Sequence, residues 1–256
     1  MGVLLSYQKL EQSKLKISNK EFIELITNHT FREENSLLEN LVDKTLEITN
    51  PIKLMNREYQ KYLYESEKEE TIEEIFAPRI YLYNTHQIEE YASSTYAEFS
   101  VNPTVIMNNY ILEDIFNKNG EQALVEESSI KDILNSHNWN YAQSYRASRI
   151  LLEEKKEKYP TLEYFIDLHR DSLEKAKTTV TIDNKDYAKV LFIIGMENSS
   201  YEKNLELTEK IDSKLKEYYP NLSKGIYKKS GVGVNGIYNQ DFSLNAILIE
   251  IGGYES

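Results

Sequence analysis

The chain has no cysteine among its 256 residues. This absence excludes disulfide bonds, zinc sites built from thiolates and a cysteine nucleophile. It fits both the cytosol and the outside of a Gram-positive cell, so cysteine usage leaves the compartment open. Long apolar runs are also missing: none approaches the length of a membrane-spanning helix, and Val3–Leu5 is too short for the core of a signal peptide. The sequence therefore predicts a soluble protein, or one whose membrane anchor is absent from this chain.

Acidic residues outnumber basic residues in this chain. Lysine and arginine total 30 against 42 aspartates and glutamates, which gives a formal net charge of −12. We therefore expect no nucleic-acid partner and no direct binding to an anionic membrane surface, because both require basic protein surfaces. The charge remains compatible with a local basic pocket for a carboxylated substrate.

The chain divides into two parts of different composition. Residues 1–75 are rich in glutamate, lysine and asparagine and contain no strand-like apolar run, so we expect a helical N-terminal region and linker. Phe31–Thr49 has the apolar spacing of an amphipathic helix, and Glu65–Glu74 is a charge run typical of a solvated linker. Residues 76–256 are expected to form the catalytic domain, which is long enough for one sizeable core.

The second part alternates apolar strands with helices. The stronger strands are expected at Ile80–His86, Tyr164–His169, Lys189–Gly195 and Ala246–Ile251, and shorter ones at Ala123–Val125 and Gly225–Lys228. Helices are expected over Thr104–Asn117, Ser129–Lys158 and Asn204–Tyr219. This order predicts an α/β fold with a mostly parallel sheet flanked by helices, in which ligands bind at the carboxyl ends of the strands.

Polar residues follow or interrupt three of the apolar strands. His86 begins the motif His86-x-x-Glu89 after the first strand, His169 closes the second, and Glu250 interrupts the last. Two imidazoles and one carboxylate leave a fourth zinc position open for water, as in hydrolytic rather than structural zinc sites. A further carboxylate can move the protons of that water. Glu250 is a candidate, because a carboxylate between two isoleucines is costly unless a charge or a reaction requires it.

The third ligand and the role of the site have alternatives. Glu89 has the right spacing from His86, but Glu90 and Glu98 are nearby carboxylates that could replace it. The histidines could also be hydrogen-bonded caps on strand ends, with Glu250 paired to an arginine.

The remaining histidines and three of the arginines point less specifically to a functional role. His29 and His137 are expected at the surface rather than at a metal. Arg146, Arg149 and Arg170 could each hold a substrate carboxylate or form a structural ion pair.

Five segments from about residue 78 onward resemble one family. They are Tyr83–Tyr91, similar to Tyr-His-Thr-His-x-x-Glu-Ser-Tyr; Ser144–Arg149, similar to Tyr-Ser-Arg-Ser; Ile166–Asp171, matching Ile-Asp-Leu-His-Arg-Asp; and Tyr238–Asp241 and Leu248–Gly253, matching the closing motifs. The family is stage II sporulation protein P, bacterial N-acetylmuramoyl-L-alanine amidases. The order and spacing of the segments make the resemblance specific.

The chain departs from the family pattern in four places. Asn84 replaces the first of two paired histidines, so this position is not expected to be an essential ligand. Glu90 replaces a serine and keeps the third ligand ambiguous. The chain stops at Ser256, where members usually continue into a last helix, and lacks the N-terminal membrane segment. Both absences suggest a trimmed or unusual member.

The resemblance implies the fold of zinc-dependent amidases and exopeptidases and a defined reaction. Zn²⁺ held by His86, Glu89 and His169 would activate water, and Glu250 would act as the general base. The bond cleaved would be the amide between the lactyl group of N-acetylmuramic acid and L-alanine of the stem peptide.

The resemblance also implies a location and partners. The family acts on peptidoglycan in the cell-wall space of spore formers during engulfment, with stage II sporulation proteins D and M. Full-length members are anchored in the membrane. Arg170, Asn239, Gln240 and Arg146 are secondary candidates for orienting ligands or substrate.

Two other functions stay open at this point. A zinc carboxypeptidase would use a similar metal set and would need an arginine to clamp a free C-terminal carboxylate. A peptidoglycan-binding scaffold with an inactive site would need no metal chemistry.

Overall fold

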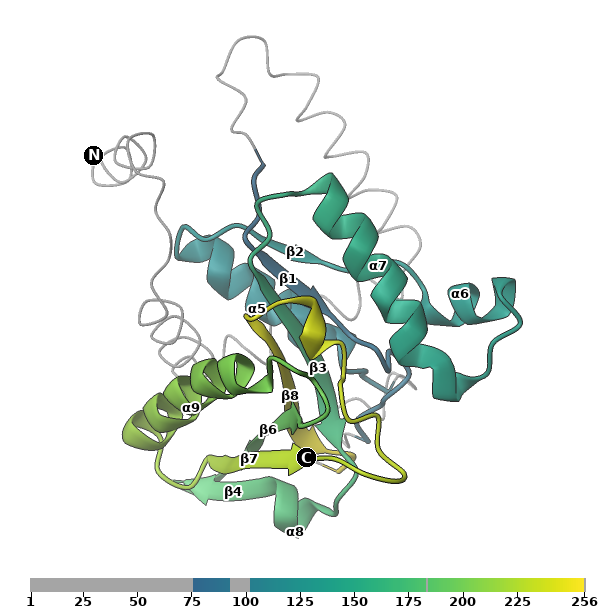
Figure 1. The fold of residues 1–256 in the computed structure, drawn as a ribbon. Coiled ribbons are helices and arrows are strands. Elements are labelled where there is room, and N and C mark those ends of the chain that lie inside the picture. The colour runs from purple at the N-terminus through teal and green to yellow at the C-terminus, as the bar shows by residue number, and fades with distance from the viewer. Residues whose placement is uncertain (1–75, 93–101, 183, 256) are drawn as a thin grey trace, which may run out of the picture.

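A computed structural model describes residues 76–92, 102–182 and 184–255 (Figure 1). The predicted N-terminal helical region, His29 and Glu98 lie outside these residues. None of the described helices combines the length and apolar character needed to cross a membrane.

The described residues form an α/β domain around one six-stranded sheet. Its strand order is β2-β1-β3-β8-β6-β7. The strands are β1 (Ile80–Tyr83), β2 (Ala123–Val125), β3 (Tyr164–Asp171), β6 (Val190–Gly195), β7 (Ser223–Lys229) and β8 (Ala246–Gly253). The first four in the sheet are parallel, whereas β6 pairs antiparallel with β8 and parallel with β7. The predicted mostly parallel sheet flanked by helices is confirmed, with a reversal between β8 and β6.

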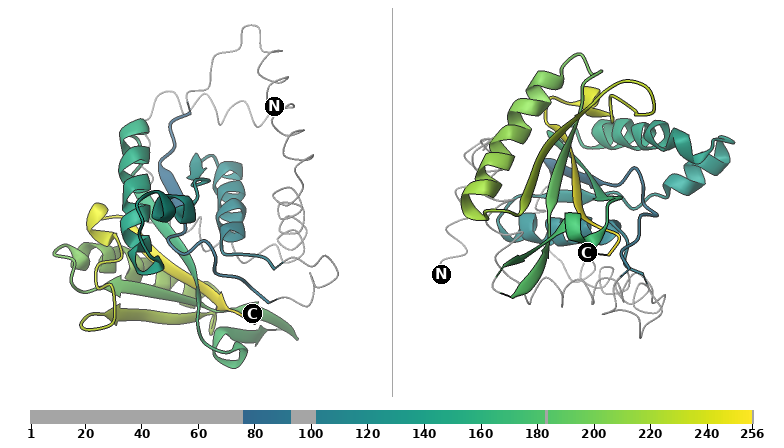
Figure 2. Two further views of the ribbon diagram at one scale, coloured as in Figure 1. Left: turned by 90° about the vertical axis from the view of Figure 1, so that its right-hand side faces the viewer. Right: turned by 90° about the horizontal axis from the view of Figure 1, so that it is seen from below.

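Helices cover both faces of this sheet, which is why its central strands are apolar on both sides. The principal helices are α5 (Ile106–Lys118), α7 (Ser144–Lys158) and α9 (Tyr201–Tyr218). Side chains of α5 and α9 share a core cluster with Ile166 and Leu168 of β3. Leu152 of α7 packs on the opposite face with Tyr81 and Phe165. Figure 2 shows these layers from two further sides.

The segment Ser129–Lys158, expected to be largely helical, forms two helices and a 3₁₀ turn in the structure. Its first part is α6 (Ile130–Ser136), capped by the Ser129 hydroxyl, which accepts from the Asp132 N–H. Asn138 then adopts a left-handed backbone (φ 54°), which a right-handed helix cannot continue. The short 3₁₀ turn η2 (Tyr141–Gln143) leads into α7. The break is followed by Tyr141 of η2, which stacks on His86 in the turn after β1.

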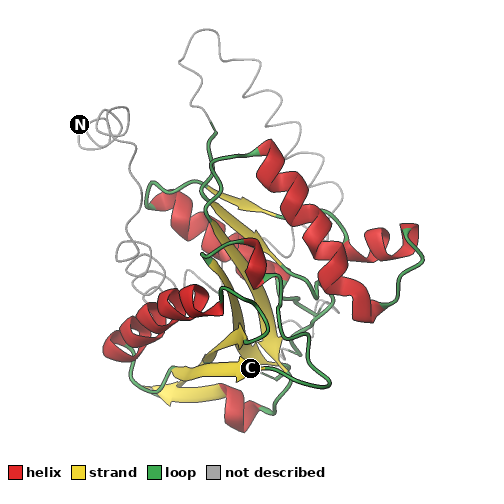
Figure 3. Cartoon of the chain, viewed as in Figure 1, coloured by secondary structure: helices red, strands yellow, loops and turns green. Residues whose placement is uncertain are grey.

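A two-stranded hairpin that the sequence analysis did not predict follows β3. It comprises β4 (Thr179–Ile182) and β5 (Lys185–Ala188), preceded by the single turn α8 (Lys175–Thr178), and is drawn in yellow and red in Figure 3. Its strands are short and partly exposed, so no continuous apolar run marks them. Asn184 at the turn is left-handed (φ 64°), in keeping with a hairpin.

Candidate metal centre

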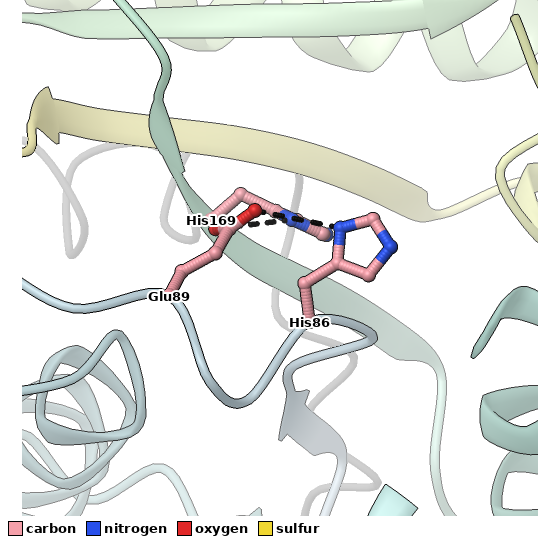
Figure 4. A group of neighbouring side chains, drawn as sticks. All are labelled: His86, Glu89 and His169. Carbon is pink, nitrogen blue, oxygen red and sulfur yellow. Dashed lines mark ion pairs between the residues drawn. The ribbon is translucent and has the colours of Figure 1, made fainter. Parts of the chain in front are cut away.

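Three predicted ligands converge at the carboxyl ends of β1 and β3 (Figure 4). His86 and Glu89 lie in the turn after β1, where the Glu89 N–H donates to the His86 carbonyl at 3.1 Å. His169 lies on the adjacent parallel strand β3. One ligand atom from each residue lies within 4.8 Å of the others, so the group could hold a metal ion. Among the residues that the structure describes, this is the one such group of histidine and carboxylate side chains.

The distances within this group fit a shared metal better than a direct ion pair. Glu89 Oε1 lies 3.4 Å from His86 Nδ1, and Glu89 Oε2 lies 3.5 Å from His169 Nδ1. A charge-assisted N–H···O hydrogen bond would measure about 2.7–2.9 Å. Two ligands of a tetrahedral zinc, each at about 2.1 Å from the ion, lie about 3.4 Å apart. Both separations are wide enough for the Glu89 carboxylate, through its two oxygens, to share a metal ion with the histidines.

Strong electrostatic coupling links the carboxylate and the buried histidine. Burial raises the pKa of Glu89, but contacts with His169 and His86 outweigh it and hold the pKa at about 2. Burial lowers the pKa of His169, but Asp167 and Glu89 outweigh it and raise the pKa to about 10. A proton on His169 must therefore leave before the same nitrogen can bind a metal.

Asp167 lies behind His169 on the same strand and was not among the predicted site residues. Its Oδ1 is 3.0 Å from His169 Nε2, although the ring N–H is not aligned for a well-formed hydrogen bond. Metal-ligating histidines commonly present their second nitrogen to a carboxylate. The usable signal was the spacing: residues 167 and 169 of a strand point to the same face. An aspartate inside an otherwise apolar strand therefore marked this position.

Glu250 lies beside the metal group on the next strand. It is the register partner of His169 in the parallel pair β3–β8. Burial raises its pKa to about 7, and the nearby Lys229, with Nζ 3.8 Å from Oε1, opposes part of this rise. A carboxylate with a pKa near neutrality can both accept and donate a proton under working conditions.

Aromatic rings surround the two histidines. Tyr141 stacks on His86 with ring centroids 5.0 Å apart and remains 47% exposed. Tyr145 meets His86 edge-on at 5.5 Å, lies 6.4 Å from His169, and contacts Tyr238 at 5.4 Å. Tyr141 therefore forms the solvent-facing wall of the site, and Tyr145 the inner wall.

Arg170 adjoins the site through its backbone and its side chain. Its N–H donates to Glu89 Oε2 at 2.9 Å, which orients the carboxylate. Its guanidinium donates from Nη1 to the Asp171 carbonyl and lies 5.4 Å from the Tyr254 ring. The buried Nε makes no hydrogen bond.

The other two arginines have partners away from the ligands. The Arg146 guanidinium lies over the Trp139 ring at 4.0 Å. Arg149 forms ion pairs with Glu153 and Asp241, both at 2.9 Å. The structure thus gives Arg149 the ion-pair role that the sequence analysis weighed as an alternative.

The two amides predicted to orient ligands or substrate are engaged inside the protein. Asn239 donates to the Tyr145 carbonyl and to Ser148 Oγ, both at 2.9 Å. Gln240, at the start of the 3₁₀ turn η3 (Gln240–Phe242), donates to the Ile193 carbonyl and accepts from the Gly195 N–H. Both side chains are buried.

The alternative candidates lie elsewhere. Glu90 is exposed and accepts from Asn102 at 3.0 Å, outside the metal group. His137 is exposed and stacks on Trp139. Asn84, which replaces the family histidine, is buried and donates to the Leu168 carbonyl at 2.6 Å. It thereby ties the end of β1 to β3.

Comparisons with known proteins give a family and a relative of the chain. Residues 5–256 match the family described as Stage II sporulation protein P (SpoIIP). The chain is similar to stage II sporulation protein P of Bacillus subtilis (strain 168), with 32% identity over 225 residues. That match covers 80% of this chain and 56% of the relative, so the chain spans little more than half the relative's length. No solved structure gives a significant match.

Proposed function

Because the chain belongs to the stage II sporulation protein P family, we propose that it is a zinc-dependent peptidoglycan amidase that acts in sporulation. The proposed reaction is hydrolysis of the amide between the lactyl group of N-acetylmuramic acid and L-alanine of the stem peptide. One observation carries the proposal: His86, Glu89 and His169 converge beside Glu250, a half-buried carboxylate with a raised pKa.

The three convergent side chains would hold the zinc. A bound zinc would supply a Lewis acid that lowers the pKa of its water to about 7 and polarises the scissile carbonyl. Among the described residues, only these three histidine and carboxylate side chains form the group, which suits a catalytic site with a position open for water. The Arg170 N–H fixes the Glu89 carboxylate, and the stacked Tyr141 ring fixes His86 from the solvent side.

Glu250 would move the protons. In its ionised form it accepts a proton from the attacking water, and in its protonated form it returns that proton to the departing amine. Both halves of this cycle require a pKa close to the working pH, which burial provides for this carboxylate. Lys229 lies close enough to favour the ionised form.

The proposed setting follows from the substrate. Peptidoglycan lies outside the cytoplasmic membrane, so we place the protein in the cell-wall space of a spore-forming cell; the family resemblance implies a membrane anchor. The resemblance suggests stage II sporulation proteins D and M as partners. The acidic net charge supports neither nucleic acid nor a bare anionic membrane as a ligand.

A carboxypeptidase is the second candidate, because one arginine lies close to the metal group. The Nε of Arg170 is buried without a hydrogen bond, and its backbone contacts the ligand Glu89. An arginine that clamps a free carboxylate is what that reaction would need.

Digestion of purified peptidoglycan by the zinc-loaded protein tests the proposal. Mass spectrometry should find complete stem peptides with a free L-alanine amino group, and glycan strands without peptides. Release of single C-terminal amino acids would instead establish a carboxypeptidase. Unchanged peptidoglycan in the presence of bound zinc would indicate a binding scaffold. Glu250→Gln is the matched control, because it preserves the shape of the site and removes the proposed base.

A further inference from the structure

A series of buried polar side chains leads away from His169. It comprises Asp167 of β3, Thr85 of the turn after β1, Ser148 of α7, and Asn239 in the loop before η3. Each of the four side chains is buried. Buried polar groups are costly unless they are hydrogen-bonded, so a series that connects four separate segments is a specific feature.

The donors that point at Asp167 both belong to Thr85. Asp167 Oδ1 accepts from the Thr85 N–H at 2.9 Å, and Asp167 Oδ2 accepts from Thr85 Oγ1 at 2.7 Å. The Thr85 hydroxyl also lies 2.9 Å from Ser148 Oγ, and the Ser148 hydroxyl itself donates to the Tyr145 carbonyl at 3.2 Å. Asn239 Nδ2 in turn donates to Ser148 Oγ at 2.9 Å. The carboxylate is thus fixed as an acceptor that faces His169 Nε2.

The far end of the series lies in a strained turn. Tyr238 and Asn239 both have left-handed backbones, with φ of 56° and 54°. Such angles are uncommon for residues with a side chain, especially a bulky one, and persist only where surrounding contacts enforce them. Here the contacts are the edge-on packing of Tyr238 on Tyr145 and the Asn239 hydrogen bonds to the Tyr145 carbonyl and Ser148. The turn delivers the Asn239 amide to the series.

From this geometry we infer that Asp167 and Thr85 are positioning residues, supported by Ser148 and Asn239, that fix the ring orientation and tautomer of His169. Asp167 Oδ1 lies 3.0 Å from Nε2 without a well-formed hydrogen bond, while Nδ1 is directed to Glu89 and the metal position; with a metal on Nδ1, Nε2 would carry the proton that faces Asp167. The inference rests on the metal-binding part of the proposed function and extends it to four residues outside the metal group. It also gives Asn239 a role inside the protein rather than at the substrate.

Zinc affinity of Thr85 variants tests the inference. Thr85→Val removes the hydroxyl that donates to Asp167 and keeps the shape and the backbone N–H. Thr208→Val is the matched control, since it removes an equally buried hydroxyl that donates to the Asn204 carbonyl at 2.7 Å in α9, far from the site in the fold. Chelator competition should show zinc binding weakened by roughly 10- to 100-fold in Thr85→Val, the range typical for such outer partners. Thr208→Val should bind zinc as the parent does.

Further comparisons separate positioning from loss of stability. Melting temperatures of the metal-free variants should fall by similar amounts, and Thr85→Ser should restore zinc affinity. Parent-like zinc binding by Thr85→Val, or equal weakening in Thr208→Val, would overturn the inference while leaving the proposed function intact. A parent protein that binds no zinc would overturn both.

Nitrogen NMR of histidine-labelled, zinc-loaded protein provides a readout independent of affinity. The chain has four histidines, so the spectrum is simple to assign. We expect His169 with its proton on Nε2 and the metal on Nδ1, and we expect Asp167→Asn to shift the Nε2 resonance. Zinc on Nε2 in the parent, or an unchanged resonance in the variant, would contradict the inference.

Discussion

His169 and Glu250 occupy paired positions on the adjacent parallel strands β3 and β8. Paired residues in a sheet project to the same face, so a metal ligand and a titratable carboxylate are held side by side by the backbone ladder itself. A rigid strand is a more accurate support for such a pair than a loop. Substitutions on these strands and in the turn that supplies the other two ligands therefore separate metal binding from proton transfer.

The first prediction concerns the metal ligands. Protein purified without chelator should contain one zinc per chain by elemental analysis, and Glu89→Ala should lose it, because the carboxylate bridges the two histidine nitrogens. Glu90→Ala is the control: it removes an adjacent, exposed carboxylate that hydrogen-bonds to Asn102. Full zinc occupancy in Glu89→Ala, with loss of zinc in Glu90→Ala, would show that Glu90 rather than Glu89 is the oxygen ligand. The double substitution His86→Ala, His169→Ala should bind no zinc.

The second prediction separates metal binding from proton transfer. Glu250→Gln should retain zinc and the melting temperature of the parent but lose turnover by roughly 100-fold or more, the usual scale for a general base. The amide keeps the size of the carboxylate but cannot accept the proton of the attacking water. Peptide release from peptidoglycan, followed at saturating zinc, measures the loss. Near-parental turnover would show that another group moves the proton.

Most of the sheet was predictable because its strands are apolar on both faces. The sequence predicted β1, β3, β6 and β8 close to their observed bounds. The sequence pattern did not show that β6 and β7 run opposite to the other strands, since the alternation of side chains along a strand is the same in both directions. The hairpin β4–β5 was missed because exposed strands of four residues carry no apolar run.

The site was predictable to the extent that strand ends mark it. His86 and His169 were identifiable because each follows a buried apolar run, and Glu89 because a turn brings residues three apart together. Asp167 was missed because it lies within a strand that otherwise reads as core. Tyr141 stacks on a ligand only because the chain breaks at Asn138, a loop geometry that composition does not encode.

The third prediction is a pH dependence of turnover. Glu250 must be ionised to accept a proton, and burial raises its pKa to about 7. The rate at low substrate should therefore fall about tenfold per pH unit below that pKa, and level off above it. Lys229 favours the ionised form of Glu250, so Lys229→Met should move the acidic limb of the pH–rate profile to higher pH. Lys228→Met, an exposed neighbour on β7, is the control and should leave the limb in place.

The fourth prediction concerns the stability of the metal-free protein. The pKa of His169 is raised from its usual 6.5 to about 10, so this group stabilises the fold fully below pH 6.5 and loses that contribution as pH rises through 10. The pKa of Glu89 is lowered from 4.5 to about 2, so its contribution is full above pH 4.5 and is lost as pH falls through 2. Both groups therefore contribute fully to the stability of the fold between pH 4.5 and 6.5.

Thermal unfolding with excess chelator should therefore give a higher melting temperature at pH 5.5 than at pH 8.5. Zinc should reverse this order, because metal binding must displace the His169 proton and its affinity rises with pH until that proton is gone. His169→Gln should reduce the difference in the metal-free protein to the part that comes from Glu250, whose pKa is raised from 4.5 to about 7, whereas His137→Gln, at an exposed position, should keep it in full. A metal-free parent that is equally stable at both pH values would show that the proton on His169 is not held by Asp167 and Glu89.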